Sequence, residues 1–151
     1  DDKYAKKTVF DLLPPEYKQM VWPIGRLDAD TVGLLLFTND GDLTQALTHP
    51  GYAHEKEYEL LVETMPTAKQ LRELREGVNV KGKTTQAAKA IIRNKKVYVT
   101  ITEGKKHQIL LMCKAVGLQI KNLKRTKVGN VRLPKTMKPG DYVSIRKKDI
   151  V

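Results

Sequence analysis

The chain has 151 residues, of which 40% are hydrophobic and 30% are charged, and it carries a net charge of +11. This length suits one domain, or one domain with a small lobe around residues 60–100, and is sufficient to bury a hydrophobic core. The sequence contains no apolar run of about 18 residues, which excludes an ordinary membrane-spanning helix and predicts a soluble protein with no membrane partner.

Charge is distributed unevenly along the chain. Residues 1–92 contain 12 Lys/Arg and 14 Asp/Glu, whereas residues 93–151 contain 16 Lys/Arg and 3 Asp/Glu. This excess of positive charge in the second segment is more than solubility requires, so it predicts a polyanionic partner, with nucleic acid as the leading candidate. Aromatic residues are sparse in the same segment, which favours phosphate contacts over base stacking.

The single cysteine, Cys113, lies within an apolar run over residues 109–113. One cysteine excludes a disulfide within the chain, and the apolar run predicts a buried, unreactive thiol. An intracellular, cytoplasmic location is the resulting expectation.

The first half of the chain contains short predicted elements. A helix is expected over residues 8–12, stopped by the Pro-Pro pair that follows. An apolar run over residues 33–38 predicts a strand buried on both faces, and residues 39–41 predict a turn. A short helix is then expected over residues 42–47, ended by Pro50.

The centre of the chain contains a strand over residues 57–62 and a helix over residues 67–76. Thr67 and Gln70 form a capping box, and Gly77 ends this helix. Alternation and β-branched residues predict strands at residues 78–80, 87–92 and 97–101.

The last third of the chain begins with a helix over residues 106–116 that is apolar on every side in its middle and is therefore expected to be buried. Strands are predicted at residues 120–123, 128–133 and 142–145, with a turn at 138–141. Because strands outnumber helices and the connections are short, the pattern predicts an α+β fold with a mixed, largely antiparallel sheet.

The carboxylates that begin at Asp28 also suggest a calcium loop, but their spacing argues against one. Counted from Asp28, the fifth position is Val32 and the twelfth is Asn39, where an EF-hand requires an oxygen ligand and a bidentate Glu. No metal site is predicted.

Residues 23–58 contain the most specific motif of the chain. It reads Arg26-Leu-Asp28, Thr31, Gly-Leu-Leu-Leu, Thr-Asn-Asp-Gly and finally Lys56-x-Tyr58. This run resembles the catalytic core of the RsuA-like ribosomal pseudouridine synthases. A second run over residues 103–133, with Gln108 in its helix, is similar to another block of that family, so the resemblance extends over nearly the whole chain.

The resemblance implies a catalytic domain over residues 1–151, built on a bent mixed sheet with flanking helices and an RNA-binding cleft. Its expected activity is isomerisation of a uridine to pseudouridine in structured RNA, without metal or cofactor. Ribosomal RNA is the expected substrate, tRNA is the alternative, and a monomer is expected. Relatives commonly carry an S4-type RNA-binding domain that does not precede Asp1 here, so the chain is expected to be a catalytic fragment or a minimal form.

The resemblance also implies roles for individual residues. Asp28 is the expected catalytic carboxylate, and substrate binding is expected from Arg26, Lys56, Tyr58 and Gln108. The basic residues expected to contact RNA are Lys105, Lys106, Lys124, Arg125 and Lys127.

One position departs from the family pattern. Two residues after Gln108, where relatives carry a cation that pairs with the catalytic aspartate, this chain has Leu110. A nearby cation keeps a carboxylate in a closed cleft ionised, and Lys114 and Arg26 are the candidates to replace it. Three interpretations remain open: an active enzyme with a relocated cation, a weakened or inactive module that binds RNA or the ribosome, and an altered sequence.

Overall fold

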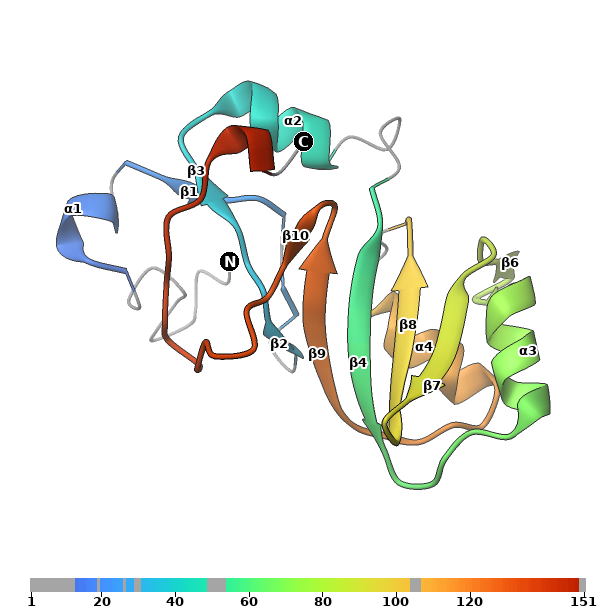
Figure 1. Ribbon diagram of the computed structural model, residues 1–151. Coiled ribbons are helices and arrows are strands. Elements are labelled where there is room, and N and C mark those ends of the chain that lie inside the picture. Colours follow the sequence, from blue (N-terminus) through green and yellow to red (C-terminus); the bar gives the residue numbers. More distant parts are fainter. Residues whose placement is uncertain are drawn as a thin grey trace, which may run out of the picture.

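The structure is a computed structural model that describes residues 13–18, 20–25, 27–28, 31–48, 54–103 and 107–149. A six-stranded sheet forms its centre, with helices at its edge and on one of its faces (Figure 1). The expected α+β class is confirmed. The helix expected at residues 8–12 lies outside the described residues.

The main sheet has the strand order β10-β9-β4-β8-β7, and β2 pairs with β9 beside this path. Its strands are β2 (Thr31–Gly33), β4 (Lys56–Val62), β7 (Lys89–Arg93), β8 (Lys96–Ile101), β9 (Ile120–Val128) and β10 (Val131–Arg132). Only the pairing of β2 with β9 is parallel. The sheet is therefore mixed and largely antiparallel, as the sequence predicted.

The longest strand, β9, corrects the prediction of two separate strands at residues 120–123 and 128–133. Residues 120–128 form one strand because β4 pairs along its whole length, with register shifts after Glu57 and after Leu61 that absorb the irregular alternation. Residues 142–145, expected as a strand, have no strand partner and are exposed. The turn at residues 138–141 is confirmed by the hydrogen bond from the Asp141 nitrogen to the Lys138 oxygen, 2.9 Å.

One face of the sheet is covered by α4 (Gln108–Ala115), which lies behind the strands in Figure 1. Apolar side chains of β4, β7, β8 and β9 pack there against α4 and α3 in the main core. Met112 and Cys113 are fully buried, and burial raises the pKa of the Cys113 thiol to about 12. The predicted buried helix and unreactive thiol are thus confirmed.

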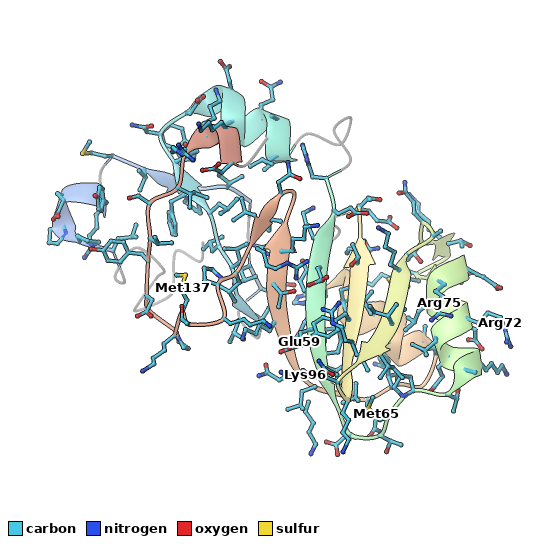
Figure 2. The ribbon with its side chains drawn as sticks, in the orientation of Figure 1. Glu59, Met65, Arg72, Arg75, Lys96 and Met137 are labelled. Atoms are coloured by element: carbon cyan, nitrogen blue, oxygen red, sulfur yellow. The ribbon has the colours of Figure 1, made fainter. Side chains whose placement is uncertain are left out.

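Helix α3 (Ala68–Glu76) lies at the β7 edge of the sheet (Figure 1). Thr67 and Gln70 form the predicted capping box, because each side chain accepts a hydrogen bond from the other residue's backbone nitrogen. Arg75, labelled in Figure 2, donates from Nε to the Ala90 oxygen of β7 at 2.8 Å. A hairpin of β5 (Asn79–Val80) and β6 (Lys83–Thr84) follows this helix.

The N-terminal part contains α1 (Pro15–Lys18), the pair β1 (Trp22–Pro23) and β3 (Phe37–Thr38), and α2 (Gly41–Thr48). Pro15 begins α1, since the fixed φ of proline suits the first helical position. The second core here comprises Ile24, Leu34, Leu36, Leu43, Leu47 and Val128.

The strand expected over residues 33–38 is interrupted. Gly33, with φ +114, ends β2, residues 37–38 form β3, and residues 34–36 between them are not in a strand. The Arg125 side chain donates to the Leu34 oxygen there. Leu34 and Leu36 remain buried in the second core. The helix expected at residues 42–47 is confirmed as α2.

Candidate active site

Asp28 lies immediately before β2 and is held by the backbone. The backbone oxygen of Asp28 accepts a hydrogen bond from the Thr31 backbone nitrogen at 2.9 Å. Thr31 begins β2, which runs parallel to β9. Gly33 allows this pairing, because a Cβ there would overlap the Arg125 oxygen and lie 2.7 Å from the Arg125 nitrogen. The carboxylate is therefore attached to the sheet through a short, closely packed strand.

The side chain of Asp28 faces the start of α4. Its Oδ2 atom lies 3.4 Å from Nδ1 of His107, and the two side chains are 29% and 41% exposed respectively. His107 is the N-cap of α4 and adopts a left-handed backbone conformation. This contact brings together two segments that are almost eighty residues apart in sequence.

Arg125 is buried within the sheet beside this site. Its Nε donates to the Leu34 oxygen at 2.9 Å, while the Arg125 oxygen accepts from the Leu34 nitrogen at 2.8 Å. Across the strands, Arg125 pairs with both Gly33 of β2 and Tyr58 of β4. A guanidinium charge is thus fixed between the strand that follows Asp28 and the strand that carries Tyr58.

Successive side chains of β4 point to opposite faces of the sheet. Lys56 and Tyr58 therefore lie on the same face as buried Leu60, which is the face that α4 covers. Burial lowers the pKa of Lys56, and the charge of Arg125 lowers it further. Two cations, Lys56 and Arg125, therefore lie close enough to repel each other, which is a favourable setting for a carboxylate or phosphate.

Gln108 follows His107 and is buried at the first position of α4. Its Nε2 lies 3.7 Å from Met112 Sδ. The substrate-binding role predicted for Gln108 stays a prediction.

The structure separates the residues expected to bind RNA. Arg26, Lys105 and Lys106 lie outside the described residues. Lys124 and Lys127 are half-buried and lie opposite Glu59 and Glu57 of β4. Arg125 is only 5% exposed, since it alternates to the core side, and this burial is unlike that of a surface phosphate contact.

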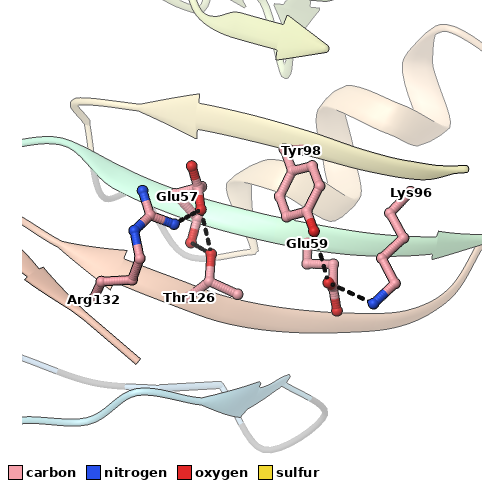
Figure 3. A network of polar contacts seen from close by, with 6 residues as sticks. All are labelled: Glu57, Glu59, Lys96, Tyr98, Thr126 and Arg132. Carbon is pink, nitrogen blue, oxygen red and sulfur yellow. Dashed lines mark hydrogen bonds and ion pairs between the residues drawn. The ribbon is translucent and has the colours of Figure 1, made fainter. Parts of the chain in front are cut away.

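The uncovered face of the sheet has its own polar network (Figure 3). Glu57 accepts from Thr126 Oγ1 and from Arg132 Nη1, both at 2.8 Å. Burial tends to raise the pKa of Glu57, but these two hydrogen bonds, together with the charges of Arg132 and Arg93, outweigh it and the pKa is lowered. Farther along, Glu59 accepts from Tyr98 Oη at 3.1 Å and pairs with Lys96 at 3.3 Å (Figures 2 and 3).

Of the two candidates for the missing cation, Arg26 lies outside the described residues and Lys114 is exposed in the last turn of α4. Leu110 packs at the margin of the main core. Among the described residues, His107 lies beside the carboxylate. Local sequence patterns do not predict the contact of His107 with Asp28, because the two residues are far apart in the chain and meet only in the fold.

A family model described as RNA pseudouridylate synthase matches residues 1–115. The chain belongs to this family. The expected resemblance to ribosomal pseudouridine synthases is thereby confirmed, since the matched segment contains Asp28, Lys56, Tyr58 and Gln108.

Individual RNA pseudouridine synthases are similar over almost the entire chain. An uncharacterized RNA pseudouridine synthase of Bacillus subtilis (strain 168) is 40% identical over 152 residues, which cover 96% of this chain and 64% of the relative. Ribosomal large subunit pseudouridine synthase B of Escherichia coli (strain K12) is 35% identical over 150 residues, covering 96% of this chain and 52% of that protein.

The fold matches a solved structure of the family. The crystal structure of a pseudouridylate synthase superimposes with a TM-score of 0.88 at 30% identity, covering 95% of this chain and 64% of that chain. The chain thus spans between about half and two thirds of the length of the proteins it matches.

Proposed function

We propose that this protein converts a uridine of structured RNA to pseudouridine and that Asp28 is the catalytic carboxylate. The observation that carries the proposal is the position of Asp28: it precedes a strand that pairs with β9, and its carboxylate contacts the N-cap of α4. Membership of the RNA pseudouridylate synthase family supports the reaction type. Ribosomal RNA is the proposed substrate, because similar proteins are named ribosomal large subunit pseudouridine synthase B.

The reaction is an isomerisation, so atoms balance within the nucleotide. The bond between C1′ of the ribose and N1 of uracil breaks, the base rotates, and C1′ bonds to C5, which loses its proton while N1 gains one. The target uridine must first unstack from its neighbouring bases, which costs a few kcal/mol. This cost is smallest for an unpaired uridine in a loop. In our proposal Arg26 displaces the base, Asp28 acts on the ribose, and Tyr58 packs on the base.

The local electrostatics support this assignment. Arg125 and Lys56 carry positive charge on the same side of the sheet as Tyr58, and RNA brings negative phosphate to that side. Gln108, buried at the beginning of α4, is proposed to contribute to the uridine pocket.

The wider RNA contact is proposed to involve Lys105, Lys106, Lys124 and Lys127, with Arg125 supporting the site from within. The groove on the uncovered face of the sheet is lined by Glu55 and Glu57 as well as by Lys89 and Lys127, and it lies on the opposite face from Tyr58, so it is not part of this proposal. We further propose that residues 1–151 act as one catalytic domain, as a monomer and in the cytoplasm. No described helix is long and apolar enough to cross a membrane.

The test is to map pseudouridine on ribosomal RNA by carbodiimide labelling and primer extension. Unmodified transcript is incubated with the wild-type chain or with Asp28→Asn, which removes the carboxylate and almost no volume. The proposal predicts one or a few new stops with the wild type and none with the variant. If neither protein produces stops but both bind RNA, the chain acts as an RNA-binding module.

A further inference from the structure

We infer that His107 is a positioning residue for Asp28 and serves where the family pattern places a cation and this chain has Leu110. The inference rests on the proposed function, since it concerns the same carboxylate. It adds a partner for one carboxylate oxygen, Oδ2.

The geometry of the pair comes first. His107 Nδ1 lies 3.4 Å from Asp28 Oδ2, and it is the charged or chargeable side chain that contacts this carboxylate among the residues the structure describes. Both side chains are partly exposed, so the pair contributes little to stability through its charges. A contact that contributes little to stability but fixes the orientation of a catalytic group fits a functional role.

The backbone of His107 points the same way. Its φ of 56° and ψ of 25° place it in the left-handed region, which residues other than Gly adopt in only a few per cent of cases, Asn, Asp and His more often than the rest. An N-cap side chain normally accepts a hydrogen bond from the first turn of its helix, but His107 makes no such bond. The backbone oxygen of His107 accepts from the Leu111 nitrogen at 3.0 Å, but its side chain does not cap the helix and is free to face Asp28. Non-glycine residues in this conformation are concentrated at functional sites.

Comparison with the other residues in this conformation strengthens the inference. Within the described ranges, Lys81, Asn94 and Lys95 are the other non-glycine residues with positive φ, and all three lie in hairpin turns, where that conformation makes the turn. His107 alone in this group lies at a helix start and contacts a carboxylate.

The chemistry of the imidazole suits the role. In its charged form both nitrogens donate, and in its neutral form Nδ1 still donates when it carries the proton. A charged imidazole at His107 therefore attracts Oδ2 at the observed distance, whereas Leu110 offers neither charge nor hydrogen bond.

His107→Gly is the sharpest variant, because glycine accepts the left-handed conformation and removes the ring. We expect its melting temperature to equal or exceed that of the wild type and its RNA affinity to stay within about threefold, while the single-turnover rate falls roughly 10- to 100-fold. Added imidazole should restore part of this rate. His107→Asn, which also tolerates the conformation and keeps a donor, should lie between the two.

Asn94→Gly is the matched control, since it relieves positive φ at 53° in a hairpin turn away from the site. It should leave the rate unchanged. A His107→Gly enzyme with the wild-type rate, or one whose loss is not reduced by imidazole or by Asn, overturns the inference.

A readout without activity separates this inference from the proposed function. In nitrogen NMR spectra, Asp28→Asn should shift the ring Nδ1 signal of His107 and leave that of His54 in place. An unmoved His107 signal contradicts the contact. If the wild type forms no pseudouridine, the proposed function fails, whereas an active wild type with a normal His107→Gly variant rejects only the role of His107.

Discussion

Lys56 illustrates how single residues of this site compromise stability. Its pKa is lowered, first by burial and then by the charge of Arg125, so the folded chain holds a cation in an unfavourable position. Groups that destabilise the fold in this way are typical of binding and catalytic sites.

Lys56→Met should therefore raise the free energy of unfolding at pH 7. In the unfolded chain Lys56 keeps its proton up to about pH 10.5, whereas in the folded chain it loses the proton at a lower pH. The free energy of unfolding of the wild type therefore rises with pH between the lowered pKa of the folded chain and about pH 10.5. The advantage of Lys56→Met should shrink across that window. Urea unfolding at pH 7 and pH 10 measures both effects, and a variant that is less stable than wild type at pH 7 contradicts this account.

The sequence predicted the candidate site residues better than it predicted the surroundings in which the structure places them. Asp28, Lys56 and Tyr58 were found because they form a motif that is local in the chain. Arg125 was assigned to a basic surface because Lys-Arg-Thr-Lys looks uniformly polar, yet the strand alternation places Arg125 in the interior. Its partner, the Leu34 oxygen, is 91 positions away.

At the scale of elements, the three-residue strand β2 connects Asp28 to the main sheet, so the position of Asp28 depends on the pairing of β2 with β9. Its three residues pair with Leu123, Lys124 and Arg125 of β9. The sequence pattern predicted helix α3 and the strands β4, β7 and β8 closely, because capping and alternation are local signals. It missed the division of residues 33–38, which follows from the approach of a distant strand to Gly33.

Gly33→Ala tests this dependence. A Cβ at φ +114 is strained, and it overlaps the Arg125 backbone, so β2 has to leave β9 or the strands have to separate. We expect a loss of about 2–4 kcal/mol in the free energy of unfolding, with a large fall in turnover. Gly82→Ala is the control for positive φ without a clash, because no atom lies within 4 Å of its Cβ position. Equal losses for the two variants would show that the clash with β9 does not matter.

At the scale of the whole molecule, the charge asymmetry and the strand order belong together. The basic strand β9 lies between β4 and the N-terminal segment that carries Asp28, whereas α3 lies at the opposite edge of the sheet (Figure 1). Positive charge is therefore placed next to the site, which the sequence predicted only as an excess over residues 93–151.

The Lys124→Gln, Lys127→Gln double variant should bind RNA less tightly and with less salt dependence. Each lost phosphate contact lowers the slope of log affinity against log salt by roughly 0.7 to 0.9, so a decrease of about 1.5 is expected. The control removes two exposed lysines at the far edge, Lys69 and Lys83, with the same loss of charge. Identical slopes for the two double variants would place the RNA elsewhere.

The most direct measurement uses RNA that carries tritium at C5 of uracil. Formation of the bond from C1′ to C5 releases this hydrogen to water, so release reports the isomerisation itself. With equimolar protein and RNA, the wild type is predicted to release the tritium of its target uridine and Asp28→Asn to release none, although both bind the RNA within a few fold of each other. Equal release by the two proteins would contradict the assignment of Asp28 as the catalytic carboxylate.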